Sequence, residues 1–359
     1  MKSRQDPAAS AATPRDARAW TQILARYRQP STGRSIVEII ITVVPLAALW
    51  VLAWATLDIG YWLALPLAIA AAGFLVRLFA IQHDCSHGAF FRHRLANDWF
   101  GRVAGVLTFT PYGVWRQAHA THHASTGNLD RRGLGDVETL TVEEYRACSF
   151  WGRLRYRLYR HPLVMFGLGP AYIFILQYRL PVGLMRGWRA WASSMTTNLA
   201  IASIVGLLIW LIGLKAFLLV HLPSLLLAAS VGVWMFYVQH QFERTSWAND
   251  REWNLHDAAL HGSSHYDLPA FLHWFTGNVG VHHVHHLNSR IPYYRLPRVL
   301  RDHPELRQVG RLTLLESFRC VRLVLWDEGQ RQLVSFADLA RRSTAVAIEP
   351  LAPSARKAA

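Results

Sequence analysis

The sequence predicts an all-α integral membrane protein in which four transmembrane helices, arranged as two hairpins, are capped by a helical cytoplasmic domain. Hydrophobic residues make up 52% of the 359 residues and charged residues only 17%, and there are 15 tryptophans. This composition is more apolar than a soluble domain needs. Several uncharged stretches approach the roughly 20 residues that cross a hydrocarbon core of about 30 Å as a helix. Histidine-rich segments begin where two of these stretches end.

The four apolar stretches form two pairs, and a short link joins the members of each pair. One link surrounds Asp58 and the other surrounds Lys215, which are the charged residues of the two links. The other lysines and arginines lie on the opposite side of the hairpins or near that interface, so the positive-inside rule places the histidines and both termini in the cytoplasm. The predicted transmembrane helices are residues 36–55, 61–80, 198–212 and 217–238.

Two further apolar stretches are expected not to cross the membrane. Residues 162–180 are apolar enough to do so, but a single crossing there would put the second and third histidine groups on opposite sides of the bilayer. We therefore expect an interfacial or re-entrant helix. Residues 100–109 are too short to span and receive the same interpretation.

The chain is expected to contain one folded domain, residues 34–340, between two mobile tails. Residues 1–33 contain Ala, Arg and Pro but no apolar start of a signal peptide, and residues 341–359 have the same character. No internal repeat or Gly/Ser linker divides the chain. Outside the membrane, the domain is expected to consist of residues 81–196 and 239–340.

The formal net charge of +15 does not indicate nucleic-acid binding, because the arginines are scattered between apolar stretches and accompany no nucleic-acid motif. A basic cytoplasmic face beside anionic lipids, able to attract an acidic redox partner, explains the charge better. Cys85, Cys148 and Cys320 form neither a disulfide framework nor a CxxC site, so we expect reduced thiols.

The 18 histidines are grouped at helical spacings. Side chains three or four residues apart project from one face of a helix and can hold the same ion. His283 points away from its neighbours in this frame and is interpreted as structural, while His240 follows the fourth helix and is the best candidate for a ninth ligand. The three groups are His83 and His87; His119, His122 and His123; and His282, His285 and His286.

Eight or nine imidazoles exceed what one tetrahedral zinc ion uses, whereas two iron ions with four or five ligands each match the supply. The HExxH motif of zinc proteases is absent, because Asp84 stands where that motif has glutamate. No metal role is assigned to His256, His261, His265 or His273, and Asn278 is left open. Carboxylates that could orient ligand imidazoles, or equally pair with arginines, are Asp84, Asp98, Asp130, Asp136, Glu243, Asp257 and Asp267.

Together with the hairpins, these motifs resemble the membrane fatty-acid desaturase superfamily over about residues 35–330, in particular the bacterial and cyanobacterial delta-12 (omega-6) acyl-lipid type. In that family an additional ligand histidine stands at the position of His240. One departure is His265, where many relatives carry an aromatic residue. The segments that carry the resemblance are residues 83–88 (HDCSHG), 115–123 (WRQAHATHH), 127–133 (GNLDRRG), 262–269 (GSSHYDLP), 274–278 (WFTGN) and 290–294 (RIPYY).

The resemblance implies O2-dependent desaturation of an acyl chain at a di-iron centre in a bacterial inner membrane. Two electrons are then needed for each turnover, and the chain carries no haem signature or cysteine cluster. A separate donor, a ferredoxin or a cytochrome b5-like protein, is therefore expected. Two alternatives stay open: a di-iron hydroxylase of an alkane, lipid or carotenoid on the same scaffold, and a membrane metal-binding protein without redox turnover, which would place its ligands at mid-membrane depth.

Overall fold

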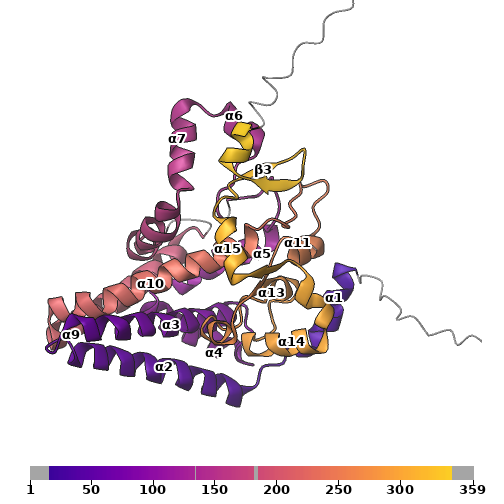
Figure 1. The fold of residues 1–359 in the computed structure, drawn as a ribbon. Helices are drawn as coiled ribbons and strands as arrows, with labels where there is room; N and C mark the ends of the chain where they lie inside the picture. The colour runs from indigo at the N-terminus through magenta and orange to yellow at the C-terminus, as the bar shows by residue number, and fades with distance from the viewer. Residues whose placement is uncertain (1–15, 134, 182–184, 342–359) are drawn as a thin grey trace, which may run out of the picture.

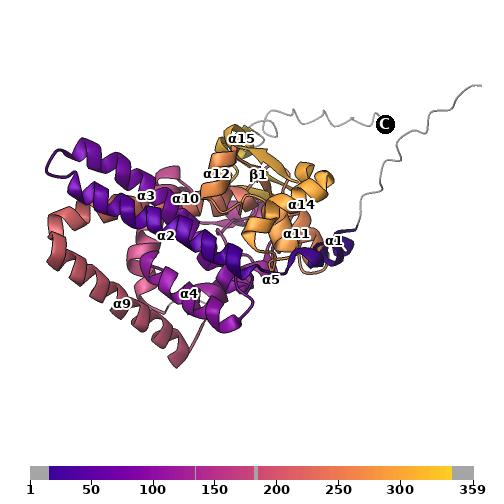
Figure 2. The same cartoon turned by 90° about the horizontal axis from the view of Figure 1, so that it is seen from below.

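Four long helices form a bundle in the computed structural model, which describes residues 16–133, 135–181 and 185–341. Each of the four is long and apolar enough to cross a membrane, which confirms the two predicted hairpins. α3 packs against both α2 and α10 and is the most buried, whereas α9 is the least buried and lies at the edge of the bundle (Figures 1 and 2). The four helices are α2 (Thr32–Ala55), α3 (Tyr61–Ser86), α9 (Trp188–Ile212) and α10 (Leu214–His240).

The helices extend further than hydropathy predicts, because an apolar stretch marks the hydrocarbon but not the end of the hydrogen-bonded helix. α3 continues to Ser86 instead of ending near residue 80, and α10 continues to His240. α9 begins at Trp188, ten residues before the predicted start. Gly213, with φ 84°, separates α9 from α10 in a backbone conformation that favours glycine. The first histidine group therefore begins inside α3 and not after it.

The two shorter apolar stretches do not become spans. Residues 100–109 fall largely in α4 (Arg94–Leu107), which exposes Leu95, Trp99 and Val103. Residues 162–180 form a run of short π, α and 3-10 helical turns that packs against α10. Among the described residues, only the four long helices qualify as spans. The run consists of η2 (Val164–Leu168), α8 (Gly169–Ala171), η3 (Tyr172–Leu176) and η4 (Gln177–Arg179).

The remaining elements form an extramembrane domain at one end of the bundle, where α3 and α10 end (Figure 1). β1 (His265–Asp267) pairs in parallel with β2 (Arg311–Thr313), and β3 (Leu325–Asp327) pairs antiparallel with β4 (Gln332–Val334). The helices are α5 (Tyr112–Ser125), α6 (Val142–Ala147), α7 (Phe150–Tyr159), α11 (Leu255–His261), α12 (Ala270–Phe275), α13 (His282–Leu287), η5 (Tyr293–Arg295), α14 (Leu296–Asp302), η6 (Pro304–Gln308) and α15 (Leu314–Cys320).

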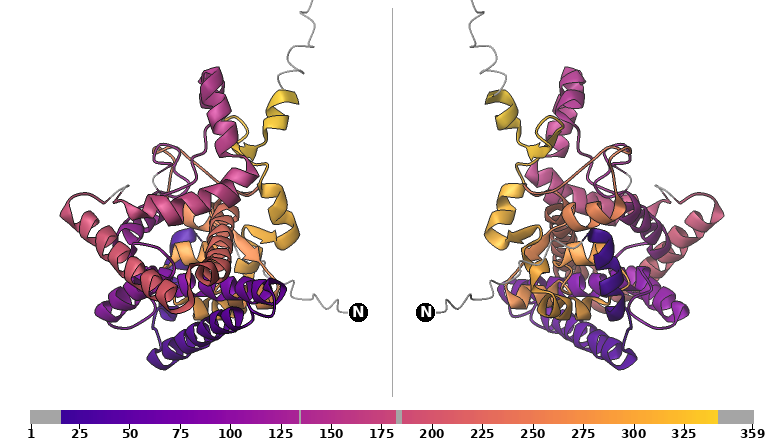
Figure 3. Two further views of the ribbon diagram at one scale, coloured as in Figure 1. Left: turned by 90° about the vertical axis from the view of Figure 1, so that its left-hand side faces the viewer. Right: turned by 90° about the vertical axis from the view of Figure 1, so that its right-hand side faces the viewer.

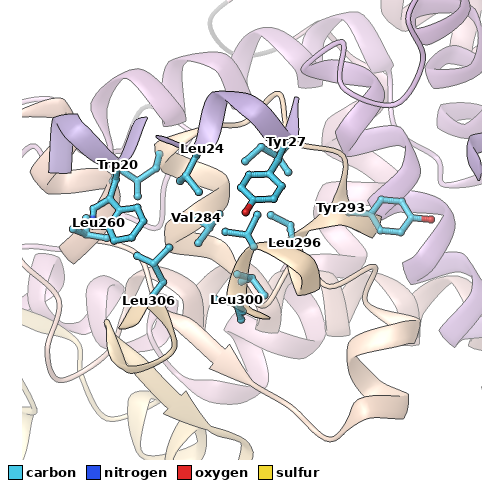
Figure 4. Close-up of a cluster of buried hydrophobic side chains, with 14 of the residues drawn as sticks. Trp20, Leu24, Tyr27, Leu260, Val284, Tyr293, Leu296, Leu300 and Leu306 are labelled. Carbon is cyan, nitrogen blue, oxygen red and sulfur yellow. The ribbon is translucent and has the colours of Figure 1, made fainter. Parts of the chain in front are cut away.

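Part of the expected N-terminal tail is folded, contrary to the sequence interpretation. α1 (Ala17–Leu24) and η1 (Ala25–Tyr27) bury Trp20, Leu24 and Tyr27 in the main hydrophobic cluster, beside Val284 of α13 (Figure 4). The Tyr27 hydroxyl donates to Asp302 at 2.6 Å. A helix of eight residues is stable only when its apolar face finds a partner, and that partner lies more than 200 residues away in the sequence. Residues 1–15 and 342–359 lie outside the described residues.

Candidate metal centre

All nine histidines proposed as metal ligands meet where α3 and α10 end. They form two groups, and within each group one ligand atom per residue lies within 4.8 Å of the others. The group of five comprises His83, His87, His119, His123 and His285. The group of four comprises His122, His240, His282 and His286.

The histidines of α5 and those of α13 are each divided between the two groups. On α5, His119 and His123 are four residues apart and serve the group of five, whereas His122 serves the group of four. On α13 the division is reversed, because His285 joins the group of five while His282 and His286 join the group of four. α5 and α13 thus lie between the two groups and contribute to both.

Imidazole nitrogens converge within each group. Nε2 of His119 lies 3.0 Å from Nε2 of His87 and 3.1 Å from Nε2 of His123. In the group of four, Nε2 of His282 lies 3.0 Å from that of His240 and 3.1 Å from that of His286. Metal–nitrogen bonds of about 2.1 Å place adjacent ligand nitrogens about 3 Å apart. The spacing therefore fits two ions, one in each group.

Burial favours the neutral form of six of the candidate ligand imidazoles, which is the form that binds metal. Desolvation, followed by the neighbouring histidines, holds the pKa of His119 and His285 well below the ordinary value of 6.5. The same causes lower the pKa of His87, His123, His282 and His286. At neutral pH these side chains present lone pairs.

Two ligands of the group of four have a partner for their second ring nitrogen. Nδ1 of His122 pairs closely with Oδ1 of Asp136, and Nε2 of His122 is buried without a hydrogen-bond partner. Nδ1 of His240 donates to the Gly262 carbonyl at 3.2 Å. Such contacts fix the tautomer and leave Nε2 free for a metal. The unpartnered Nε2 of His122 is therefore available as a metal ligand.

Of the seven carboxylates that could orient ligand histidines, Asp136 is the one that lies within hydrogen-bond distance of a ligand ring nitrogen. Asp84 lies farther away, with Oδ1 at 3.7 Å from Nδ1 of His83. Asp98 pairs instead with Arg116, Asp267 pairs with Arg311, and Asp130 accepts from the Asp250 amide. Glu243 and Asp257 are exposed.

The histidines set aside by spacing lie outside both groups. Nε2 of His283 donates to the Leu306 carbonyl at 2.9 Å. Asn278 donates to the Tyr293 carbonyl at 3.5 Å. A third group, not predicted from the sequence, comprises His265, Asp267 and His273. Two of its ring nitrogens have partners, because Nδ1 of His265 donates to the Arg307 carbonyl and Nε2 of His273 accepts from the Leu268 amide. Nδ1 of His273 is buried without a hydrogen-bond partner. It lacks the converging free nitrogens of the other two groups.

A buried ionic network that was not predicted from the sequence adjoins the group of five through Asp84. Arg77 of α3 pairs with Glu38 of α2, and its guanidinium lies 3.9 Å from the centre of the Trp274 ring. Glu38 accepts from the Tyr293 hydroxyl at 2.9 Å, and the Tyr293 amide donates to Asp84 at 2.6 Å. Glu38, Arg77, Tyr293 and Asp84 are each 1% exposed. Glu38 and Arg77 lie inside the predicted spans 36–55 and 61–80. Their presence there could have predicted the pair, because charged residues are rare in membrane spans unless they are paired.

Apolar surface adjoins the histidines on the membrane side. The Trp115 ring stacks on His119 with 4.7 Å between centres, and Phe79 contacts Trp115 at 5.2 Å. A separate cavity of about 230 Å³ lies within the bundle, bounded by α2, α3, α4, α9, α10 and η3. With the exception of His221, the residues that line it are hydrophobic.

Comparison with known proteins agrees with this architecture. The fatty acid desaturase family model matches residues 60–314. A Bacillus subtilis fatty acid desaturase is 43% identical over 338 residues, which cover 94% of this chain and 95% of that protein. Two proteins of Synechocystis are similar: an sn-1 acyl-lipid omega-3 desaturase (ferredoxin), 29% identical over 75% of each chain, and an sn-1 oleoyl-lipid 12-desaturase, 28% identical over 66% of this chain and 67% of that protein. The chain belongs to the fatty acid desaturase family and is an integral membrane enzyme of that family.

Proposed function

We propose that this desaturase introduces a double bond into the acyl chain of a membrane lipid, with O2 as oxidant, at a di-iron centre held by the nine grouped histidines. Two sets of converging imidazoles near the ends of membrane helices support this assignment most directly. Nitrogen ligands support iron in more than one oxidation state. When bound, the iron pair would supply the oxidising power needed to break unactivated C–H bonds.

The chain's own residues would position the acyl chain and keep water away from it. Trp115 and Phe79 of α3 form an apolar surface next to His119. The side chains of Trp115 and Phe79 carry no charge. An alkyl chain that approaches the group of five along them would therefore displace few protein–water hydrogen bonds. Asp136 and the Gly262 carbonyl would hold His122 and His240 in the ligand tautomer.

The delta-12 (omega-6) position is proposed from the resemblance of the histidine motifs and is compatible with the similarity to an oleoyl-lipid 12-desaturase. Gas chromatography of total fatty acids from an expressing host, followed by mass spectrometry of derivatives that mark the double bond, tests both reaction and position. A new double bond at carbon 12 is expected. A double bond elsewhere refutes only the position, whereas a hydroxylated product would favour the hydroxylase.

A small, acidic redox protein such as a ferredoxin is the proposed electron donor; one Synechocystis relative is described as ferredoxin-dependent. A cytochrome b5-like protein would meet the same requirement. A small cavity of about 20 Å³ beside His240 of the group of four is lined in part by Arg132, Asp136 and Trp247, and the neighbouring Arg131 is exposed. We expect turnover to fall as salt rises and when Arg131 is replaced by Gln. Turnover independent of both would argue against this face.

The proposed location is a bacterial inner membrane with the metal centre and both termini on the cytoplasmic side. The two links between the paired helices contain one lysine and no arginine, and the other basic residues lie elsewhere in the chain. This distribution supports the orientation by the positive-inside rule. Reporter fusions test this orientation. A reporter that works only in the cytoplasm should be active when fused to the C-terminus, and one that works only outside should be active when inserted at Ile59 of the first link.

A further inference from the structure

α7 (Phe150–Tyr159) lies crosswise to the membrane-spanning helices. In Figure 1, α2, α3 and α10 run roughly from left to right and α7 stands upright above α10; in both views of Figure 3, α7 projects away from the bundle. A helix in this orientation runs along the plane of the bilayer. α7 precedes the helical segment that packs on α10 and is hydrogen-bonded to residues of the extramembrane domain.

One face of α7 is fastened to the extramembrane domain. Tyr156 is 5% exposed, and its hydroxyl donates to the Val324 carbonyl at 2.5 Å and accepts from the Leu140 amide at 3.1 Å. Arg157 donates to the Tyr145 hydroxyl at 2.6 Å. These contacts determine which side of α7 faces the protein.

The opposite face is an exposed apolar stripe. Phe150, Leu154 and Leu158 recur every four residues and are 71%, 37% and 55% exposed, and Trp151 beside them is 73% exposed. With 3.6 residues per turn, these four side chains lie on the side of the helix away from Tyr156. Soluble surfaces rarely expose so much aromatic and aliphatic area on one short helix.

Basic residues border this stripe. Arg153 and Arg155 are exposed, and α7 contains no acidic residue. The stripe continues into the next segment, where Leu163, Leu168 and Leu176 are 72%, 69% and 60% exposed. That segment packs on the spanning helix α10. The exposed apolar side chains of α7 are therefore followed along the chain by further ones on a segment that contacts a membrane-spanning helix.

We infer that α7 is an in-plane membrane anchor that inserts Phe150, Trp151, Leu154 and Leu158 into the interfacial layer of the bilayer, with Arg153 and Arg155 at the lipid phosphates. An apolar stripe bordered by arginines is the pattern of an interfacial helix. The crosswise orientation, the absence of acidic residues and the contact of the following apolar segment with α10 favour the bilayer over a protein partner. The anchor would hold the extramembrane domain, and with it α6 and β3, at a constant height above the lipid.

Spin-label accessibility of the full-length protein in phosphatidylglycerol proteoliposomes tests this inference. One label is placed at Leu154→Cys, and a control label at Asn249→Cys, an exposed position between α10 and α11. Both variants carry Cys148→Ser so that this partly exposed thiol is not labelled, whereas Cys85 and Cys320 are buried. The Leu154 label should be accessible to O2 and shielded from a water-soluble nickel chelate, and the Asn249 label should show the reverse. Equal nickel accessibility at the two positions would overturn the proposal.

Two comparisons distinguish the lipid from other occupants. Replacing phosphatidylglycerol with phosphatidylcholine, or Arg153 and Arg155 with Gln, should reduce the shielding at Leu154, because the electrostatic attraction is lost. Dipolar broadening that disappears on dilution with unlabelled protein would instead identify a second copy of the chain on α7 and would also overturn the proposal.

Discussion

The two histidine groups differ in how the fold holds them. The group of four has local support, because Asp136 and the Gly262 carbonyl hold the second nitrogens of His122 and His240. The group of five begins with His83, whose Nδ1 is buried without a hydrogen-bond partner. Its nearest carboxylate, Asp84, is committed to the Tyr293 amide and through Tyr293 to Glu38 of α2.

This difference shows two ways to place ligands at a membrane surface. In the group of four, individual hydrogen bonds hold two of the four imidazoles, His122 and His240. The group of five depends on the position of the end of α3, which the Glu38–Arg77–Tyr293–Asp84 network joins to α2 and to the segment after α13. Substitutions should therefore affect the groups separately.

Removing a ligand should have the largest effect. His119→Ala or His285→Ala in the group of five should abolish product formation, and bound iron should fall from about two ions per chain to about one, because each group holds its own ion. Fatty-acid analysis and elemental analysis of purified protein measure the two effects. His93→Ala, an exposed histidine outside both groups, is the matched control. Full activity after loss of His119 would refute the di-iron assignment.

Breaking the buried network should be the next largest effect. Glu38→Gln leaves Arg77 buried without its counter-ion, which costs about 3–5 kcal/mol of folding stability. Tyr293→Phe removes one hydrogen bond and should cost about 1–2 kcal/mol. Thermal unfolding in detergent measures both, and a cycle with the double variant measures the coupling. Loss of one of the two iron ions from these variants would link the network to the group of five. If the free-energy losses of the two single variants add up in the double variant, the residues do not share one network.

Removing the local support of the group of four should be milder. Asp136→Asn cannot hold His122 in the ligand tautomer as a carboxylate does, so iron affinity should fall about 10- to 100-fold. Competition with a chelator measures this loss. Asp98→Asn changes a carboxylate that pairs with Arg116 and should leave iron affinity unchanged. If the two variants behave alike, Asp136 has no special role.

Mild acid should produce the smallest and most gradual effect. The pKa of His87, His119, His123, His282, His285 and His286 is lowered by burial. In the unfolded chain these groups take up protons near pH 6.5, whereas the folded protein resists protonation. The stability of the metal-free protein should therefore be constant above about pH 6.5 and fall as the pH decreases below it. Melting temperatures of chelator-treated protein between pH 8 and pH 5 measure this; a constant value would contradict burial as the cause.

Much of the fold could be predicted because the deciding signals are local. Hydropathy locates the four spans to within about ten residues, and spacings of three and four predict which imidazoles share a helix face. The helix ends were wrong because capping and hydrogen bonding decide them, as at Gly213 and His240. α1 was missed because its composition resembles that of a tail, and only contact with the distant α13 and its neighbours stabilises it.

The sequence by itself determined the membrane class and the two hairpins and supplied the nine candidate ligand histidines, since each follows from the order of neighbouring residues. Tertiary structure alone decided how these histidines are divided, because α5 and α13 each contribute to both groups and their relative rotation cannot be derived from spacing. It also selected Asp136 among seven candidate carboxylates and paired Arg77 with Glu38. Buried polar groups must find partners, and which partner each one finds depends on segments brought together only by folding.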